Sequence, residues 1–126
     1  MGALSNTHAI ELLNYSLRNS TVYMALYLND PGADASGTEV SGTGYGRVAI
    51  TLGVPSIVGG KATSSNTNAV NFGTAGSAWG TVAYWAIYSA STSGQLLWYG
   101  AFSRSKTIEI NDSVVVAIGE LDVTLS

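Results

Sequence analysis

The residue types with the clearest potential for chemistry are one histidine and eight carboxylates. His8 falls in the first turn of a helix predicted over residues 6–18, where the helix dipole disfavours a charged imidazole. A catalytic triad would also need a serine nucleophile, and the sequence contains no Gly-x-Ser-x-Gly nucleophile elbow. We therefore expect His8 to be a surface residue without a catalytic role.

The loop acids and the glycines after them could hold an ion or a phosphate. Asp30, Asp34 and Glu39 share one polar segment, and carboxylates could gather around calcium, although their spacing matches no calcium loop. The glycines of residues 42–46 lead into a predicted strand instead of a helix N-terminus. We expect a solvated loop, no enzyme activity, no cofactor and no metal, with the question of a loop cation left open.

The composition favours one assembling domain over a nucleic-acid or membrane protein. The 126 residues are 46% hydrophobic and only 10% charged, with a net charge of -3, scattered basic residues and no cysteine. A nucleic-acid footprint needs a basic patch, and a membrane helix needs roughly 20 apolar residues. We expect a single domain over residues 1–126 that functions without disulfides, in the cytosol or in a particle assembled there.

The predicted helix gives residues 1–19 the character of an N-terminal helical arm. Ser5 or Asn6 can cap it, and Ile10, Leu13 and Leu17 recur at helical spacing. A narrow apolar stripe of this kind can cover one end of a sheet or dock on a neighbouring subunit. Both uses stay open, with docking slightly favoured.

After the helix the apolar period changes to two, which predicts strands. The expected strands lie near residues 22–28, 48–54, 69–72, 82–88, 96–102, 108–110, 114–118 and 121–125. Residues 59–68 are expected to form a turn or exposed loop. Residues 82–88 are apolar on both faces, so they and residues 96–102 predict a central hairpin turned at Ser93 and Gly94. The pattern predicts an all-β, single-domain β-sandwich, for which a jelly roll is one possible form.

Three tryptophans and seven tyrosines could form a sugar-stacking platform, or fill the core and subunit interfaces. Aromatics inside two-faced apolar strands more commonly do the latter. Trp79 lies among glycines, so we expect it to be the most exposed of the three tryptophans.

Several segments together resemble a known family. The residues that carry the resemblance are Tyr23–Gly32, Glu39–Val48, Trp79–Tyr88 and Leu121–Leu125. The most specific string is Glu-Val-Ser-Gly followed by Gly-Tyr-x-Arg, which contains Tyr45 and Arg47. The chain is similar to small virion proteins of tailed phages, whose members are described as capsid cement or decoration proteins and as tail-fibre proteins. It departs from them at Tyr27-Leu28-Asn29, where similar proteins often have a His-Thr pair.

The resemblance and the composition together imply a capsid cement protein on the virion surface, assembled in the host cytoplasm. It would act as a homo-oligomer, expected to be a homotrimer, bound between major capsid proteins, where many equivalent contacts add up. The alternative is a tail-fibre or receptor-binding module that recognises a cell-surface glycan through Trp79, Tyr45 and the loop acids. The contact regions are expected to be the helix and residues 30–46. The candidate interface residues are Ile10, Leu13, Leu17, Tyr45, Arg47 and Trp79.

Overall fold

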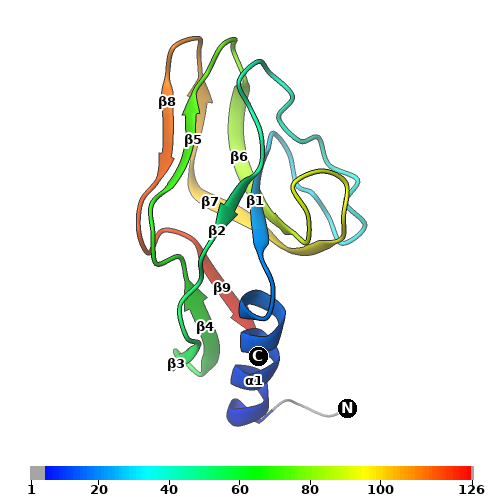
Figure 1. Cartoon of the computed structure of the whole chain (residues 1–126), viewed down its shortest axis with the longest axis vertical. Coiled ribbons are helices and arrows are strands. Elements are labelled where there is room, and N and C mark those ends of the chain that lie inside the picture. Colours follow the sequence, from blue (N-terminus) through cyan, green and yellow to red (C-terminus); the bar gives the residue numbers. More distant parts are fainter. Residues whose placement is uncertain (1–4, 126) are drawn as a thin grey trace.

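A computed structural model describes residues 5–125, which form one helix and nine strands (Figure 1). The helix α1 spans Asn6–Arg18. Ser5 caps it by accepting a hydrogen bond from the backbone N–H of His8 at 3.2 Å, as Ser at this position is expected to do. The predicted helix over residues 6–18 is therefore confirmed.

The strands pair in antiparallel fashion into sheets of four, three and two strands. The four-stranded sheet has the order β2-β1-β6-β7, the three-stranded sheet β3-β4-β9, and the ribbon β5-β8. The strand bounds are β1 Val22–Tyr27, β2 Val48–Ile50, β3 Ser56–Val58, β4 Lys61–Ser65, β5 Val70–Thr74, β6 Gly80–Tyr88, β7 Leu96–Ile108, β8 Ser113–Val116 and β9 Asp122–Leu125. This confirms the all-β sandwich class. The pairing differs from the eight-stranded, two-sheet arrangement of a jelly roll.

The strand expected over residues 82–88 is β6, and it lies inside the four-stranded sheet as predicted. β6 pairs with β1 from Tyr23 opposite Tyr88 to Tyr27 opposite Tyr84, and its other edge pairs with β7. β7 itself lies at the edge of the sheet, so the expectation of a central hairpin holds only for β6. Ser93 and Gly94 both have positive φ, which confirms the predicted turn between β6 and β7.

Two strand predictions were wrong in segments that are rich in polar residues, where the apolar alternation expected of a strand is weak. Residues 59–68, expected as a turn or loop, contain β4, in which Ala62 and Ser64 are buried. Ile108, expected in a separate strand over residues 108–110, ends β7 after a run of exposed polar residues. Hydrophobic periodicity fails in both places because small or solvent-facing polar side chains also fit a pleated sheet.

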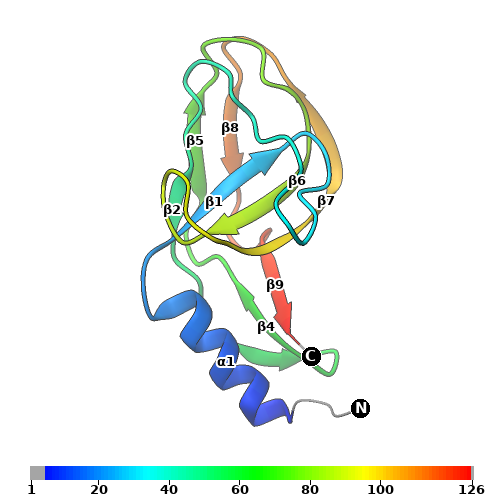
Figure 2. The same ribbon diagram turned by 90° about the vertical axis from the view of Figure 1, so that its right-hand side faces the viewer.

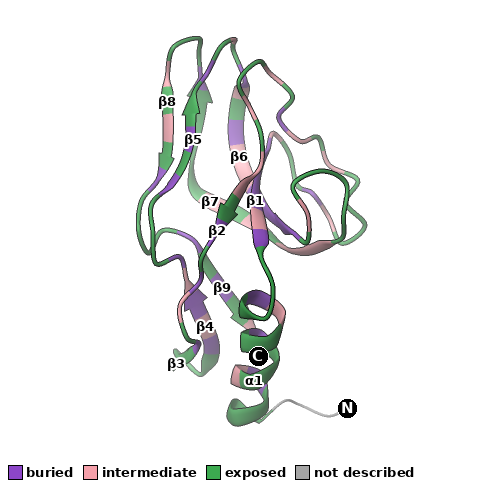
Figure 3. Ribbon diagram, viewed as in Figure 1, coloured by how far each residue is buried: buried purple, intermediate pink, exposed green. Residues whose placement is uncertain are grey.

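The helix covers one end of the molecule, where it packs on the β3-β4-β9 sheet (Figure 2). Its residues Ala9, Leu13 and Leu17 are buried, and the outer face of the helix is exposed (Figure 3). Of the two uses considered for the apolar stripe, the structure shows the first, because the stripe covers the chain's own sheet. Contacts between α1 and a neighbouring subunit would have to use its outer face.

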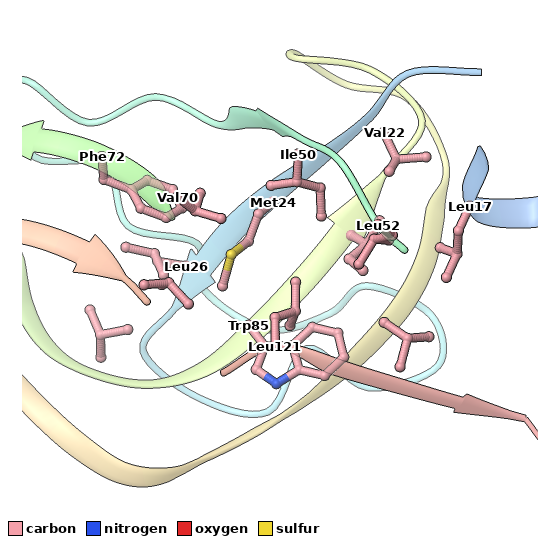
Figure 4. Close-up of a cluster of buried hydrophobic side chains, with 14 of the residues drawn as sticks. Leu17, Val22, Met24, Leu26, Ile50, Leu52, Val70, Phe72, Trp85 and Leu121 are labelled. Atoms are coloured by element: carbon pink, nitrogen blue, oxygen red, sulfur yellow. The ribbon is translucent and has the colours of Figure 1, made fainter. Parts of the chain in front are cut away.

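One large core joins the helix to all three sheets. Its members include Leu17 on α1, Met24 on β1, Phe72 on β5 and Leu121 before β9 (Figure 4). A second, small cluster of Ala25, Tyr27, Ala86 and Tyr88 has Tyr84 and Leu96 packed against it. The residue Asn66 is buried but fully used, since it bonds the carbonyls of Asn68 and Ala117 and the N–H of Leu121.

Candidate functional site

The long polar segment after β1 folds back along that strand. The N–H of Val40 donates to the carbonyl of Leu26 at 3.0 Å, and Leu28 donates to Thr38 at 2.9 Å. A Cβ at Gly37 would lie 2.6 Å from the carbonyl oxygen of Asp30, so the close return of the chain requires glycine there. Residues 30–46 are thus tied to the sheet by backbone hydrogen bonds.

Glu39 and Arg47 form a two-point ion pair across this segment. Arg47 donates from Nε to Glu39 Oε2 at 3.0 Å and from Nη2 to Oε1 at 2.9 Å. Its Nη1 also donates to the carbonyls of Ala90 and Ser93, and its guanidinium lies 3.7 Å from the ring centre of Tyr88. The hydrogen bond to Glu39 raises the pKa of Arg47. Arg47 therefore joins the segment to the turn after β6.

Tyr45 completes this arrangement from the core side. Its hydroxyl donates to Glu39 Oε2 at 2.6 Å and accepts from the backbone N–H of Leu26 at 3.0 Å. Its ring stacks on Phe72 and meets Trp79 edge-on, with ring centres 6.2 and 5.5 Å apart. Burial, and then the hydrogen bond to Glu39, raise the pKa of Tyr45 well above its ordinary value.

We use the name Glu39 clamp for Glu39, Tyr45, Arg47 and Tyr88. Sequence reasoning singled out Tyr45 and Arg47 as interface candidates, and the structure brings both onto the Glu39 carboxylate. It missed Tyr88, whose hydroxyl makes a short hydrogen bond with that of Tyr27. Burial raises the pKa of Tyr27. The clamp fits a structural role because its polar groups hydrogen-bond one another or neighbouring groups of the same chain.

Trp79 is buried, with 3% of its surface exposed, so the expectation that it is the most exposed tryptophan was wrong. Its indole N–H donates to the carbonyl of Thr43 at 3.0 Å. A Cβ on Gly42 would collide with Cδ1 of Trp79, so Gly42 makes room for the ring. The neighbouring glycines suggested exposure, whereas they allow the backbone of a second segment to approach the indole.

The helical interface candidates are mostly used within the chain. Leu13 and Leu17 are buried and Ile10 is half-buried, whereas the exposed large apolar side chains of α1 are Leu12 and Tyr15. Partner contacts by Ile10, Leu13, Leu17, Tyr45, Arg47 and Trp79 stay a prediction. A buried side chain could reach a partner only if the fold rearranged locally.

The loop acids Asp30, Asp34 and Glu39 do not form a metal site in the described part of the chain. Over residues 5–125 there is no group of three or more His, Cys, Asp or Glu side chains placed to share an ion. The carboxylate of Glu39 is turned to Arg47 and Tyr45, and Oδ1 of Asp30 accepts from the N–H of Gly32 at 3.0 Å. His8 is exposed on α1, 4.0 Å from Glu11.

Within residues 5–125, no helix is long and apolar enough to cross a membrane.

Comparison with known proteins identifies one related family. The family model described as "Podophage GP4 fiber I protein gp80" matches residues 3–124, which is nearly the whole chain. No curated protein matches the chain.

Proposed function

The chain belongs to the podophage GP4 fiber I protein gp80 family, and we propose on that premise that it is a building block of a phage fibre. Family membership makes it a bacteriophage structural protein, with the virion as its place of action. The family description names a fiber protein, and that name supports our choice of the fibre. A structural role also suits a site whose charged groups bond one another.

The observation that carries an assembly role is the set of large apolar side chains left in solvent on a charge-poor surface. These side chains are Leu12, Tyr15, Val54, Ile57, Val58, Tyr99, Ile110, Val115 and Ile118. Only 10% of the residues are charged, so few charges would have to lose water when such a surface meets a partner. Protein interfaces are depleted in charge in the same way.

The end formed by α1 and β3 is the favoured contact between copies. Leu12 and Tyr15 are exposed on α1, Ile57 and Val58 are exposed on β3, and the two elements contact each other. β3 is also a sheet edge, with three exposed residues and one free side for backbone hydrogen bonds. Self-association through this end, as a homotrimer, is the arrangement we propose.

A capsid cement role is the second candidate. The same charge-poor surface could bind between major capsid proteins, where a modest contact per copy is multiplied by the symmetry of the shell. The sequence resemblance supports this alternative, because similar proteins include cement and decoration proteins. Neither role requires a catalytic residue.

The deciding experiment is cryo-electron microscopy of intact virions in which this chain carries a small epitope tag bound by Fab. Fab density on the fibres supports the proposal, and density at symmetric positions on the head shell would replace it with the cement role.

Light scattering of the purified chain at several concentrations tests the proposed homotrimer independently. A strictly monomeric chain at high concentration would contradict self-association.

A further inference from the structure

The edge strand β7 contains a wide bulge that shapes the surface next to it. Val82 of β6 pairs with Lys106, whereas Tyr84 pairs with Ala101, so residues 102–105 lie opposite the single residue Ala83. A bulge bends a strand and redirects its side chains, and bulges are enriched beside functional sites. Phe102 and Arg104 belong to this bulge, and both line a hollow together with Glu120 of the connection between β8 and β9.

A groove of about 560 Å³ lies between the bulge and that connection. Its main lining residues are Trp85, Phe102, Ser103, Arg104, Glu120 and Asp122. The volume lies within the range of about 300–1,000 Å³ that is typical of small-ligand sites. We call it the Trp85 groove.

Trp85 gives this groove a hydrogen-bond donor that no residue of the described range 5–125 uses. The indole N–H groups of Trp79 and Trp98 donate to Thr43 and Ser16, but no acceptor among the described residues bonds Nε1 of Trp85. Trp85 is only 9% exposed, yet its nitrogen is not sealed from solvent. Figure 4 shows the nitrogen on the side of the ring directed away from Ile50 and Met24. Buried indole N–H groups usually find a partner, so the groove lacks an acceptor here.

Gly100 leaves room for the Trp85 ring on the neighbouring strand. A Cβ at Gly100, the cross-strand partner of Trp85, would lie 2.7 Å from the indole Cζ2 atom. Any larger residue would therefore push the ring out of its place. The close approach of β7 at Gly100 therefore depends on glycine and leaves the ring beside the groove.

The charged groups of the groove are also unpaired with one another. Arg104 lines the same hollow as Glu120 and Asp122, yet no ion pair joins it to either acid in the described part of the chain. The Ser65 hydroxyl bonds one oxygen of Asp122, and no side chain or backbone group of residues 5–125 bonds the other. The groove therefore offers hydrogen-bond acceptors on the Glu120 and Asp122 carboxylates and donors on the Arg104 guanidinium.

An apolar hollow of about 320 Å³ continues from the groove and shares Phe102, Arg104 and Glu120 with it. Its remaining walls include Leu26, Val82 and Ile108, together with Lys106. A ligand in the combined space would therefore meet an aromatic edge and aliphatic side chains as well as the polar groups.

We propose that the Trp85 groove binds a saccharide. Sugar hydroxyls donate to Glu120 and Asp122 and accept from Arg104 and the Trp85 N–H, while the C–H face of the ring packs on Phe102. A bare cation is disfavoured by Arg104 and Lys106, and a polyanion by the Glu120 and Asp122 carboxylates. The proposal rests on the fibre role only for its biological setting, since binding is a property of the isolated chain.

The test starts with the purified full chain on an array of bacterial oligosaccharides and polysaccharides. The best-bound oligosaccharide is then titrated into the ¹⁵N-labelled chain, and the three indole N–H signals are followed by NMR. We expect the Trp85 signal to shift, while the Trp79 signal, whose N–H is bonded to Thr43, stays in place. Trp85→Phe keeps an aromatic ring, assigns the signal, and should weaken binding about tenfold.

Two exposed substitutions keep the test valid if Trp85→Phe disturbs the fold. Arg104→Ala and Glu120→Gln should each weaken saccharide binding, whereas Glu11→Gln on α1 is the matched control outside the groove. No binding to any arrayed saccharide, or binding that these groove variants leave unchanged, would overturn the proposal. Because the virion location is measured separately, a failure of saccharide binding leaves the fibre role standing.

Discussion

The guanidinium of Arg47 grips the carboxylate of Glu39 through two parallel hydrogen bonds of 3.0 and 2.9 Å. The Arg47 side chain is only 10% exposed and that of Glu39 24%, so water competes weakly for either group. Two-point bonds of this kind depend on the planar fork of arginine, which lysine lacks. The Nη1 of Arg47 also donates to the carbonyls of Ala90 and Ser93, which joins the segment before β2 to the turn after β6.

Arg47→Met should destabilise the protein by about 3 kcal/mol. The substitution leaves the Glu39 carboxylate largely desolvated without its cation, which costs about 3–5 kcal/mol when a pair is fully buried. We place the value at the low end because Glu39 keeps some contact with water. Urea unfolding of both proteins, followed by tryptophan fluorescence, gives the difference in free energy of unfolding.

The matched control for this pair is Lys61→Met, at the exposed start of β4. A surface change of this kind usually alters stability by less than about 0.5 kcal/mol. Arg47→Lys should fall between the two variants because it keeps the charge and loses the fork. Equal stabilities for Arg47→Met and Lys61→Met would show that the clamp contributes nothing to folding.

Gly42→Ala should destabilise the fold by about 1–3 kcal/mol, the usual cost of overpacking. The added methyl group would collide with the Trp79 ring, whose N–H bonds the carbonyl of Thr43. Gly46→Ala is the control, because a Cβ at Gly46 meets nothing within 4 Å. Thermal unfolding should separate the two variants clearly. A similar Tm for both would contradict the close packing of Trp79.

Local pattern was enough to predict the elements whose signals are strong and periodic. The helix over residues 6–18 shows apolar residues at helical spacing after a Ser cap, and β6 shows apolar residues on both faces. The motif around Tyr45 and Arg47 was found through family resemblance. The structure adds that both residues bond Glu39.

Much of what local pattern did not predict concerns contacts between residues distant in sequence. The approach of Gly42 to Trp79 and the hydrogen bonds from Arg47 to the turn after β6 depend on tertiary folding, which local periodicity does not encode. β4 was missed because its side chains are small and polar. The Trp85 groove depends on a bulge in β7, and a bulge shifts register without a distinctive residue pattern.

The stability of the protein should fall as the pH rises above about 10, and Tyr45 should contribute to that fall. In the unfolded chain a tyrosine loses its proton near its ordinary pKa of 10, whereas burial raises the pKa of Tyr45 in the fold. The folded state then holds more protons than the unfolded state, so the stabilisation is complete below pH 10 and is lost above it. Urea unfolding between pH 8 and pH 11 measures this slope.

Tyr45→Phe removes both the hydrogen bond that the hydroxyl accepts from Leu26 and the titration of that hydroxyl, and the two effects are measured at different pH values. At pH 8 the variant should lose about 1–3 kcal/mol, because the backbone N–H of Leu26 loses its acceptor. Above pH 10 its stability should fall less steeply than that of the wild type. Tyr99→Phe, at an exposed position of β7, should change neither value. An unchanged slope in Tyr45→Phe would refute the assignment.

Leu13→Ala should destabilise the protein by about 2–5 kcal/mol, as expected for removing a fully buried leucine side chain. Leu12 directly precedes Leu13 and lies on the exposed face of α1, so Leu12→Ala should change the free energy of unfolding by less than about 1 kcal/mol. Chemical unfolding of the isolated monomer measures both. If Leu13→Ala were tolerated as well as Leu12→Ala, α1 would not be packed on the β3-β4-β9 sheet.

Tyr15→Ser combined with Val58→Thr should weaken self-association while the fold stays intact. Both side chains are largely exposed, at 69% and 60%, so neither contributes much to the core, but both would lose water in a contact through α1 and β3. Light scattering over a range of concentrations should show the oligomer dissociating at higher protein concentration than for the wild type. The matched control is Val115→Thr on β8, which is similarly exposed on another element. If that control weakened assembly and the double variant did not, the contact between copies would lie on the β5-β8 ribbon instead.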